Sequence, residues 1–404
     1  MWFEMTDVDQ TPQNYPMTRT CPFVEAPGYA RLRDQGIAPV RMPTGATAWG
    51  VTKYEYVKRL LLDDRLSSNL RDPGFPVLAE HMRPPAEFDT SLIGMDDPEH
   101  GAARRAVLGE FTVRAINRLR PRIQEIVDDC VDAMLAGPRP ANLVEVVGYP
   151  VPVTVICELL GVPLADRDFF EEASTVYLRP TSTPEEGGQA LKALMEYMHE
   201  LVAAKEREPD DALLGRQVRR RGEPGVAGHD GLVGLGIMLL MAGHETTANM
   251  ISLGVLTFLQ HPDQLAKVRA DPSRIPDGVE ELLRFYSIAE IGASRVAVGD
   301  IEIGGVTIKA GDGVLNLTSA ANRDPAEFPN PDRFDLDRGG HGHVAFGFGR
   351  HQCLGQNLAR AELEIVLETL FRRIPDLRLA VPFEELSFNT DSVNYGVSAL
   401  PLTW

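Results

Sequence analysis

The sequence predicts a mainly helical fold with a minor β portion. Apolar residues recur every three or four positions over six long segments, whereas strand-like segments are few and short. With 404 residues, of which 44% are hydrophobic, the chain can bury a large core. Its Pro- and Gly-rich stretches are short and lie between periodic segments, which indicates loops and not linkers. We therefore expect residues 1–404 to form one domain.

The apolar spacing predicts helices along most of the chain. Examples, in chain order, are Tyr54–Leu62, Ile116–Leu135, Leu191–Val202, Leu232–Leu259, Val279–Phe285 and Leu354–Ile374. The predicted strands are short and lie beside glycine turns. They are Ala48–Val51, Ser294–Ala297, Ile301–Ile303 and Val306–Ile308.

The net charge of 40 − 58 = −18 argues against nucleic acid and anionic membranes as partners, because both require a basic face. Four cysteines without paired spacing, and a start at Met1–Gln10 that has neither a basic region nor an apolar stretch, indicate a cytoplasmic protein. The longest apolar segment, Gly231–Gln260, is interrupted by His244 and Glu245, so we expect a core helix and not a membrane span. We also expect a monomer.

One cysteine lies in a glycine-rich loop that leads directly into a predicted helix, Phe346-Gly-Phe-Gly-Arg-His-Gln-Cys-Leu-Gly355. Gly347 and Gly349 allow backbone angles that other residues resist, and Phe346 can shield the sulfur. The amides at the start of the helix are expected to lower the pKa of the Cys353 thiol. A soft anionic ligand of this kind suits haem iron.

Two other interpretations of the cysteine remain open at this point. Cys353 could be a free core cysteine like Cys21, Cys130 or Cys157, since free cysteine is a common core residue. Alternatively, His341, His343, His351 and Cys353 could form a zinc site, although such a site needs neither Phe346 nor the paired glycines.

The cysteine loop resembles the proximal signature of the cytochromes P450, the haem-thiolate monooxygenases. Phe346, Gly349, Cys353 and Gly355 stand on the fixed positions of that signature, and His351 stands two residues before the cysteine. The resemblance implies a cytochrome P450 fold, with haem (heme b, iron protoporphyrin IX) between the central helix and the helix that follows the loop. It also implies that Cys353 is the axial ligand of the iron.

The central helix contains the sequence Ala242-Gly-His-Glu-Thr-Thr247, with an acid beside a hydroxyl residue. Thr246 can bond back to the carbonyl of Ala242, which bends the helix and leaves room for water or dioxygen, and Gly243 removes a side chain nearby. Glu245 next to Thr246 offers a carboxyl-to-hydroxyl proton relay. The segment resembles the oxygen-activation motif of the family, which implies that the alcohol and the acid deliver protons for O–O cleavage. Without Cys353, a back-bonded threonine and a solvated glutamate would explain the same residues.

Glu281 and Arg284 stand at i and i+3, where they can pair on one helix face. Glu80 and Arg83 have the same spacing, so the pattern alone is weak. Only Glu281 and Arg284 are followed by short strands and a Pro-rich stretch, as in the E-x-x-R helix of the family. The resemblance implies a second arginine, Arg338 or less favourably Arg333, and a network that holds the cysteine loop.

His100 and Arg104 stand four apart after Asp96-Asp-Pro98, so both project from one helix face. An arginine with a histidine suits carboxylates in a partly buried site. The stretch resembles the propionate-binding helix of the family, and the resemblance adds Arg295 and His351 as further propionate contacts. Taken singly, each of these side chains is better explained as solvated.

The matches run in order from residue 97 to residue 355, so the resemblance covers essentially the whole chain. It implies a bacterial monooxygenase that inserts one oxygen atom of O2 into an unactivated C–H bond. The closest likeness is to the soil-bacterial branch that tailors secondary metabolites and oxidises drugs and sterols. The substrates expected from that branch are bulky hydrophobic small molecules such as macrolides, polyenes, statins and sterol-like compounds.

Two related functions on the same fold remain as alternatives. A peroxygenase would use peroxide directly, but that branch replaces the acid–alcohol pair present here as Glu245-Thr246. A non-catalytic haem sensor would keep Cys353 without needing Thr246.

No flavin domain or iron–sulfur cysteine cluster occurs in the sequence, so we expect electrons from NAD(P)H through ferredoxin reductase and ferredoxin. Arginines near the haem motifs could make the docking face for ferredoxin locally basic, although Arg104 is expected to be taken by a propionate. These are Arg104, Arg105, Arg350 and Arg360.

By resemblance, the substrate pocket is expected to use apolar residues from several variable segments. The residues named for it are Leu92, Ile93, Met238, Ile288, Ile291 and Val393.

Overall fold

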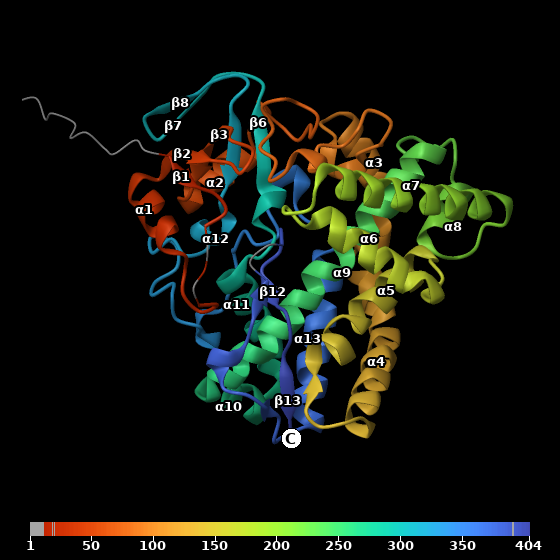
Figure 1. Cartoon of the computed structure of the whole chain (residues 1–404), viewed down its shortest axis with the longest axis vertical. Coiled ribbons are helices and arrows are strands. Elements are labelled where there is room, and N and C mark those ends of the chain that lie inside the picture. The colour runs from red at the N-terminus through yellow and green to blue at the C-terminus, as the bar shows by residue number, and fades with distance from the viewer. Residues whose placement is uncertain (1–11, 18, 20, 390–391) are drawn as a thin grey trace, which may run out of the picture.

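The computed structural model describes residues 12–17, 19, 21–389 and 392–404 (Figure 1). The expectation about a signal peptide at Met1–Gln10 lies outside these residues. The described chain is mainly helical with a small β portion, as the sequence predicts.

Thirteen α-helices are present in the described residues. They are α1 (Pro27–Gln35), α2 (Tyr54–Leu61), α3 (Glu99–Leu108), α4 (Val113–Ala136), α5 (Pro150–Leu160), α6 (Arg167–Leu178), α7 (Pro184–Arg207), α8 (Leu213–Arg219), α9 (His229–Gln260), α10 (Pro262–Ala270), α11 (Ile275–Tyr286), α12 (Thr318–Ala321) and α13 (Gln356–Arg373).

The long helix α9 runs through the body of the molecule and packs against α5, α7 and α13 (Figure 1). It is long and apolar enough to cross a membrane, but 61% of its most apolar window is buried inside the protein. Its side chains belong to the main hydrophobic core, so α9 is packed as the core helix that the sequence predicts.

Local sequence explains where several of these helices begin and end. The Thr183 hydroxyl accepts a hydrogen bond from the amide of Glu186 at the start of α7, and the Glu186 carboxylate accepts one from the Thr183 amide. The Thr112 hydroxyl accepts from the amide of Ala115 and caps α4 in the same manner. Helix α9 ends at Gln260, because Pro262 cannot continue it and instead occupies the first turn of α10.

The largest sheet lies beside α1 and α2 at one end of the molecule (Figure 1). Its strands, in spatial order, are β1 (Gln13–Asn14), β2 (Ile37–Arg41), β3 (Thr47–Val51), β9 (Gly313–Asn316), β6 (Ser294–Ala297) and β4 (Leu66–Ser67). β1 pairs parallel with β2 and β3 parallel with β9, and the remaining neighbours are antiparallel.

Three smaller sheets complete the β portion. They are β10 (Arg378–Leu379) with β13 (Pro401–Thr403) and β5 (Ala141–Asn142), β11 (Phe388–Asn389) with β12 (Gly396–Val397), and β7 (Ile301–Ile303) with β8 (Val306–Ile308).

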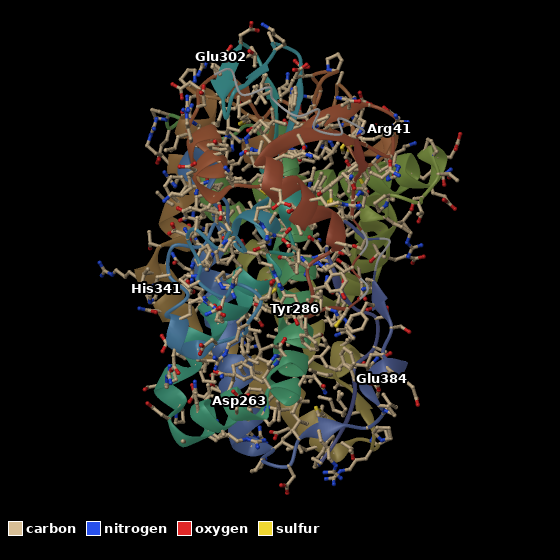
Figure 2. All side chains as sticks on the ribbon, turned by 90° about the vertical axis from the view of Figure 1, so that its left-hand side faces the viewer. Arg41, Asp263, Tyr286, Glu302, His341 and Glu384 are labelled. Atoms are coloured by element: carbon tan, nitrogen blue, oxygen red, sulfur yellow. The ribbon has the colours of Figure 1, made fainter. Side chains whose placement is uncertain are left out.

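A view turned by 90° shows how the sheet end and the helical end are connected (Figure 2). Glu302 of β7 lies at one end, Asp263 of α10 lies near the other, and Tyr286 at the end of α11 lies between them (Figure 2). Tyr286 is fully buried, and its hydroxyl lies 2.7 Å from the hydroxyl of Thr257 in α9. α11 is therefore anchored to α9 beneath the segment that leads into the sheet.

Each helix and strand predicted from the sequence is present, with bounds that differ by a few residues. The other nine strands of the described residues were not predicted, and for two of them, β2 and β9, the reason is identifiable. β2 contains Pro39, which argues against an inner strand, yet it pairs on both sides. All four residues of β9 are buried, so no apolar–polar alternation marks it.

Candidate functional site

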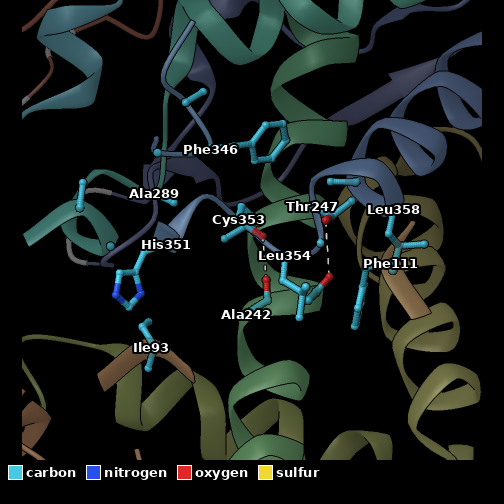
Figure 3. A pocket seen from close by; sticks show the side chains of 18 of the residues that line it. Ile93, Phe111, Ala242, Thr247, Ala289, Phe346, His351, Cys353, Leu354 and Leu358 are labelled. Carbon is cyan, nitrogen blue, oxygen red and sulfur yellow. Dashed lines mark hydrogen bonds between the residues drawn. The ribbon is translucent and has the colours of Figure 1, made fainter. Parts of the chain in front are cut away.

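A cavity of about 290 Å³ lies between α9 and the loop that carries Cys353 (Figure 3). Ala242 and Thr247 of α9 line it together with Cys353, and His351 lies toward one side near Ile93 (Figure 3). The cavity therefore brings together three motifs that are far apart in the sequence.

The loop before α13 is shaped by its glycines and by one backbone hydrogen bond. Gly347 and Gly349 have φ angles of 70° and 74°, which side-chain-bearing residues rarely adopt. A Cβ on Gly349 would also lie 2.9 Å from the carbonyl oxygen of Leu61 in α2. The Cys353 amide donates to the Phe346 carbonyl at 2.8 Å and closes the loop.

Cys353 is exposed to the cavity, unlike Cys157, which is buried in the core. Burial in the protein raises the pKa of the Cys353 thiol, whereas the amides of Gly355 and Gln356 and the guanidinium groups of Arg104 and Arg360 lower it. The predicted effect of the helix amides is present, but the expectation of a lowered pKa was wrong, because the effect of desolvation on the pKa is larger. Coordination to a metal deprotonates a thiol directly.

Four nitrogen-bearing side chains converge at one side of the cavity: His100, Arg104, Arg295 and His351. The rings of His100 and His351 stack with centroids 3.9 Å apart. Both ring nitrogens of His100 are buried and make no hydrogen bond among the described residues, although Nδ1 lies 3.6 Å from Asp97 Oδ1. An unpaired buried donor indicates a missing partner.

The electrostatics of these four groups indicate an anionic partner. Burial and the charges of Arg295 and His100 lower the pKa of His351 to about 2, and burial lowers the pKa of Arg295 to about 10. Burial and the charge of Arg104 also lower the pKa of His100. Carboxylates placed here would raise these pKa values again and would accept hydrogen bonds from the histidine and arginine nitrogens. The site therefore fits the propionates of a haem.

On α9, the Thr246 hydroxyl donates to the Ala242 carbonyl at 2.9 Å, as the sequence predicts. Thr246, Ala242 and Gly243 all line the cavity. A Cβ on Gly243 would lie 2.9 Å from the side chain of Ile156, so this glycine also allows α5 to approach α9. Thr247, which sequence reasoning did not select, lines the cavity as well.

The direct relay expected from Glu245 to Thr246 is not formed. The Glu245 carboxylate accepts a hydrogen bond from the Ser392 hydroxyl at 2.9 Å, and Glu245 does not line the cavity. Burial raises the pKa of Glu245, while hydrogen bonds from Ser392 and Asn394 lower it. The acid therefore lies next to Thr246 in sequence but bonds to the C-terminal segment.

Glu281 and Arg284 form a bidentate ion pair with both side chains fully buried. Arg284 Nε lies 2.7 Å from Glu281 Oε2, and Arg284 Nη2 lies 2.8 Å from Glu281 Oε1. Arg338 is the third member, with its Nε 3.1 Å from Glu281 Oε1. Arg333 instead accepts a hydrogen bond from Arg284 through its backbone carbonyl oxygen. Among the candidates for the second arginine, the structure thus selects Arg338.

This network is connected to the cysteine loop through one asparagine. Arg284 donates to the carbonyl of Asn322 at 2.8 Å, and the side-chain oxygen of Asn322 accepts from the amide of Val344 at 2.8 Å. Val344 comes just before Phe346, so the buried ion pair supports the start of the loop.

Four of the six predicted substrate-pocket residues line the cavity: Leu92, Ile93, Met238 and Ile288. The other two, Ile291 and Val393, do not line this cavity but pack against the hydrophobic cluster at the sheet end of the molecule, although Ala289 and Gly292 beside Ile291 do line it.

Glu362 of α13 was missed by sequence reasoning, although it lines the cavity. Its side chain is buried, its Oε2 has no partner in the described part of the chain, and burial raises its pKa well above the ordinary value. The sequence did contain a signal for a buried acid. Glu362 stands one turn after Leu358 and one turn before Val366, on an otherwise apolar face of the helix.

The zinc alternative does not agree with the arrangement. His343 lies 3.3 Å from Glu280, His341 is exposed at the surface, and neither lines the cavity with Cys353 (Figure 2).

Comparisons with known proteins agree with the geometry. The family model described as "Cytochrome P450" matches residues 178–374. "Cytochrome P450 105A3" of Streptomyces carbophilus is 46% identical over 392 residues, which cover 96% of this chain and 95% of the relative. "Vitamin D3 dihydroxylase" of Streptomyces griseolus is 44% identical over 407 residues, 99% of this chain and 100% of the relative.

A solved structure shows the same architecture. The crystal structure of mycinamicin VIII C21 methyl hydroxylase from Micromonospora griseorubida, bound to mycinamicin VIII, superposes with a TM-score of 0.91. The two sequences are 41% identical, and the superposition covers 97% of this chain and 100% of the hydroxylase chain. The predicted fold and bacterial branch are confirmed. The chain belongs to the cytochrome P450 family, as a monooxygenase of the CYP105 group of actinomycete enzymes.

Proposed function

We propose that the protein hydroxylates an unactivated C–H bond of a bulky hydrophobic small molecule with one oxygen atom of O2. The observation that supports this reaction is a single cavity lined by Cys353, by the α9 groove at Ala242 and Thr246, and by an apolar surface beyond them. A thiol that a metal can deprotonate, a hydroxyl group and a substrate pocket are thus available in one place.

The residues fit a haem held without covalent attachment, heme b. Cys353 would be the iron ligand, and His100, Arg104, Arg295 and His351 would bind the propionates. The sequence contains no Cys-x-x-Cys-His segment for covalent attachment of a haem. When bound, the haem supplies the reductive activation of dioxygen and the oxidation of the C–H bond.

Thr246 and Glu245 would manage protons at the α9 groove. The Thr246 hydroxyl, held on the Ala242 carbonyl, lines the cavity and can orient water there. Glu245 is largely buried and holds its proton more tightly than an exposed glutamate, and Ser392 connects it to the C-terminal segment. The acid would therefore exchange protons through Ser392 and water, and not by a direct bond to Thr246.

The substrate class follows from the apolar lining of the pocket. Leu92, Ile93, Met238 and Ile288 come from three separate segments, one of them α9 itself, and line the cavity. The two relatives above are named for a reaction on vitamin D3 and for binding mycinamicin VIII. For this chain we propose a compound of comparable bulk, in the range of macrolides, polyenes, statins and sterol-like molecules.

Electrons are proposed to arrive from NAD(P)H through ferredoxin reductase and a ferredoxin, with the enzyme a monomer in the cytoplasm. The arginines named for the docking face differ in whether they already pair with other groups of the protein. Arg350 is paired with Asp64 and Asp97, Arg360 is paired with Glu280, and Arg104 bonds to the Gln352 carbonyl. Arg105 is exposed at the end of α3, so it is the best candidate to meet an acidic partner.

Two measurements test the proposal. Wild-type protein should purify red, and its reduced carbonyl complex should absorb at the long wavelength that a thiolate ligand gives. Cys353→Ser should lose that band, while Cys157→Ser, which changes a buried core cysteine, should keep it.

A screen of hydrophobic compounds by their shift of the haem Soret band should then find ligands, and turnover with ferredoxin and reductase should yield hydroxylated products. Retention of the long-wavelength band in Cys353→Ser would overturn the ligand assignment. A protein that binds such ligands but turns over none of them would be a sensor and not a hydroxylase.

A further inference from the structure

We infer that His199, His229 and Asp230 form a binding site for one divalent transition metal ion of the zinc class. His199 lies on α7, whereas His229 and Asp230 are the first two residues of α9. One ligand atom from each of the three residues lies within 4.8 Å of the others. None of the three lines the haem cavity, so the site is separate from the hydroxylation site.

The two histidines already face each other through the correct atoms. His199 Nδ1 lies 2.9 Å from His229 Nε2, and the ring planes are 23° apart. On a tetrahedral zinc ion with Zn–N bonds of about 2.0–2.1 Å, two nitrogens lie about 3.3 Å apart. The rings would have to separate by about 0.4 Å and turn toward the ion, which is within reach of side-chain rotation.

Glu206 of α7 prepares His229 as a ligand. The His229 Nδ1 lies 3.0 Å from Glu206 Oε1, where the carboxylate can accept its proton. This hydrogen bond leaves the lone pair of the neutral ring on Nε2, the nitrogen that faces His199. A carboxylate behind a metal-binding imidazole is the usual way in which proteins set the tautomer and orientation of that ligand.

The Glu206 carboxylate also pairs with Arg221, which holds it in place behind His229.

The ligand set indicates the class of metal. Two imidazoles and one carboxylate suit zinc and its neighbours better than calcium or magnesium, which prefer oxygen ligands. Both histidines are half-buried and Asp230 is exposed, so an ion can enter from solvent and keep a water as fourth ligand. Bound there, the ion would fasten α7 to the beginning of α9.

The test uses the haem-containing protein without an affinity tag, stripped of metal with a chelator and titrated with ZnCl₂ by calorimetry. Wild type should bind one equivalent, and the thermal midpoint of unfolding should rise with added ZnCl₂. His199→Ala and His229→Ala should lose this equivalent and the rise. Glu206→Gln keeps the three ligands and should bind about 10–100-fold more weakly.

Two matched variants serve as controls. His261→Ala removes another histidine at an end of α9, whose Nδ1 bonds to the Thr257 carbonyl at 2.8 Å, and Glu196→Gln changes an exposed acid on α7. Both should bind ZnCl₂ as wild type does. The inference is overturned if wild type binds no stoichiometric equivalent, or if His199→Ala and His229→Ala bind as tightly as His261→Ala.

Discussion

Thr246 is the residue on which coupling of oxygen reduction to hydroxylation should depend. Its hydroxyl lines the cavity and is fixed on the Ala242 carbonyl. Other hydroxyl residues in α9 make the same type of bond, for example Ser252 to the Ala248 carbonyl at 3.1 Å, but Ser252 is buried away from the cavity. The bond itself is therefore a common helix feature, and what distinguishes Thr246 is its position at the cavity.

Thr246→Ala should bind substrate normally but divert electrons from NAD(P)H to peroxide. Without the hydroxyl, proton delivery fails, so kcat for product should fall by about 10²-fold while KM changes little. The measurement compares NAD(P)H consumed, peroxide released and product formed. Ser252→Ala is the control and should stay coupled; equal coupling in Thr246→Ala and wild type would refute the role.

Ser392 offers a second test at the residue scale, through the pKa of Glu245. The Ser392 hydroxyl donates to the Glu245 carboxylate and lowers its pKa, against the rise that burial causes. Ser392→Ala removes this contribution, so the pKa should move further up and the carboxylate should appear only at higher pH. Because Glu245 delivers protons in its protonated form, the alkaline limb of the turnover–pH profile should shift to higher pH.

Ser398→Ala is the matched control, because Ser398 bonds to Asn389 in the same C-terminal segment and not to Glu245. It should leave the profile in place. A profile that does not move in Ser392→Ala, or moves to lower pH, would show that Glu245 does not limit turnover.

At the scale of elements, α11 supports the cysteine loop through the buried pair of Glu281 and Arg284. The pair binds Arg338 on one side and reaches Val344 through Asn322 on the other. Removing one partner leaves an uncompensated buried charge. The stability of the loop that carries Cys353 therefore depends on a buried ion pair in α11.

Glu281→Ala should lower the free energy of unfolding by about 3–5 kcal/mol and prevent normal haem incorporation. The measurements are denaturant unfolding and the ratio of haem to protein absorbance. Glu125→Ala removes a glutamate from an exposed i, i+3 pair with Arg122 and should change both quantities little. A stable, fully loaded Glu281→Ala protein would show that the pair is dispensable.

The charge distribution matters at the scale of the whole molecule. The chain carries a formal charge of −18, so an acidic ferredoxin would be repelled over most of the surface and attracted only at local basic points. Because Arg350 and Arg360 are already paired with carboxylates, Arg105 is left as the main candidate of the four named arginines.

Arg105→Glu should slow electron transfer from ferredoxin while leaving ligand-induced Soret shifts intact. Turnover of wild type should also fall as salt rises, because the Debye length shrinks from about 10 Å at 0.1 M to about 3 Å at 1 M. Arg207→Glu, an exposed change at the end of α7, is the control with the same charge difference. Salt-independent turnover or full activity of Arg105→Glu would exclude this docking point.

The sequence by itself determined the long helices and the local chemistry of the motifs. The loop from Phe346 to Gly355, the back-bonded Thr246 and the i, i+3 pair of Glu281 with Arg284 were predictable because each depends on residues within one turn of helix or one loop. Helix periodicity is local in the same sense.

Only the tertiary structure decided which distant residues meet. Glu245 bonds to Ser392, 147 residues away, although its sequence neighbour Thr246 was the expected partner. Ile291 and Val393 pack against the hydrophobic cluster at the sheet end, and the pairing of His199 with His229 depends on how α7 crosses the start of α9. The packing of whole helices and sheets fixes such contacts, and a pattern that repeats every three or four residues carries no information about where another helix will lie.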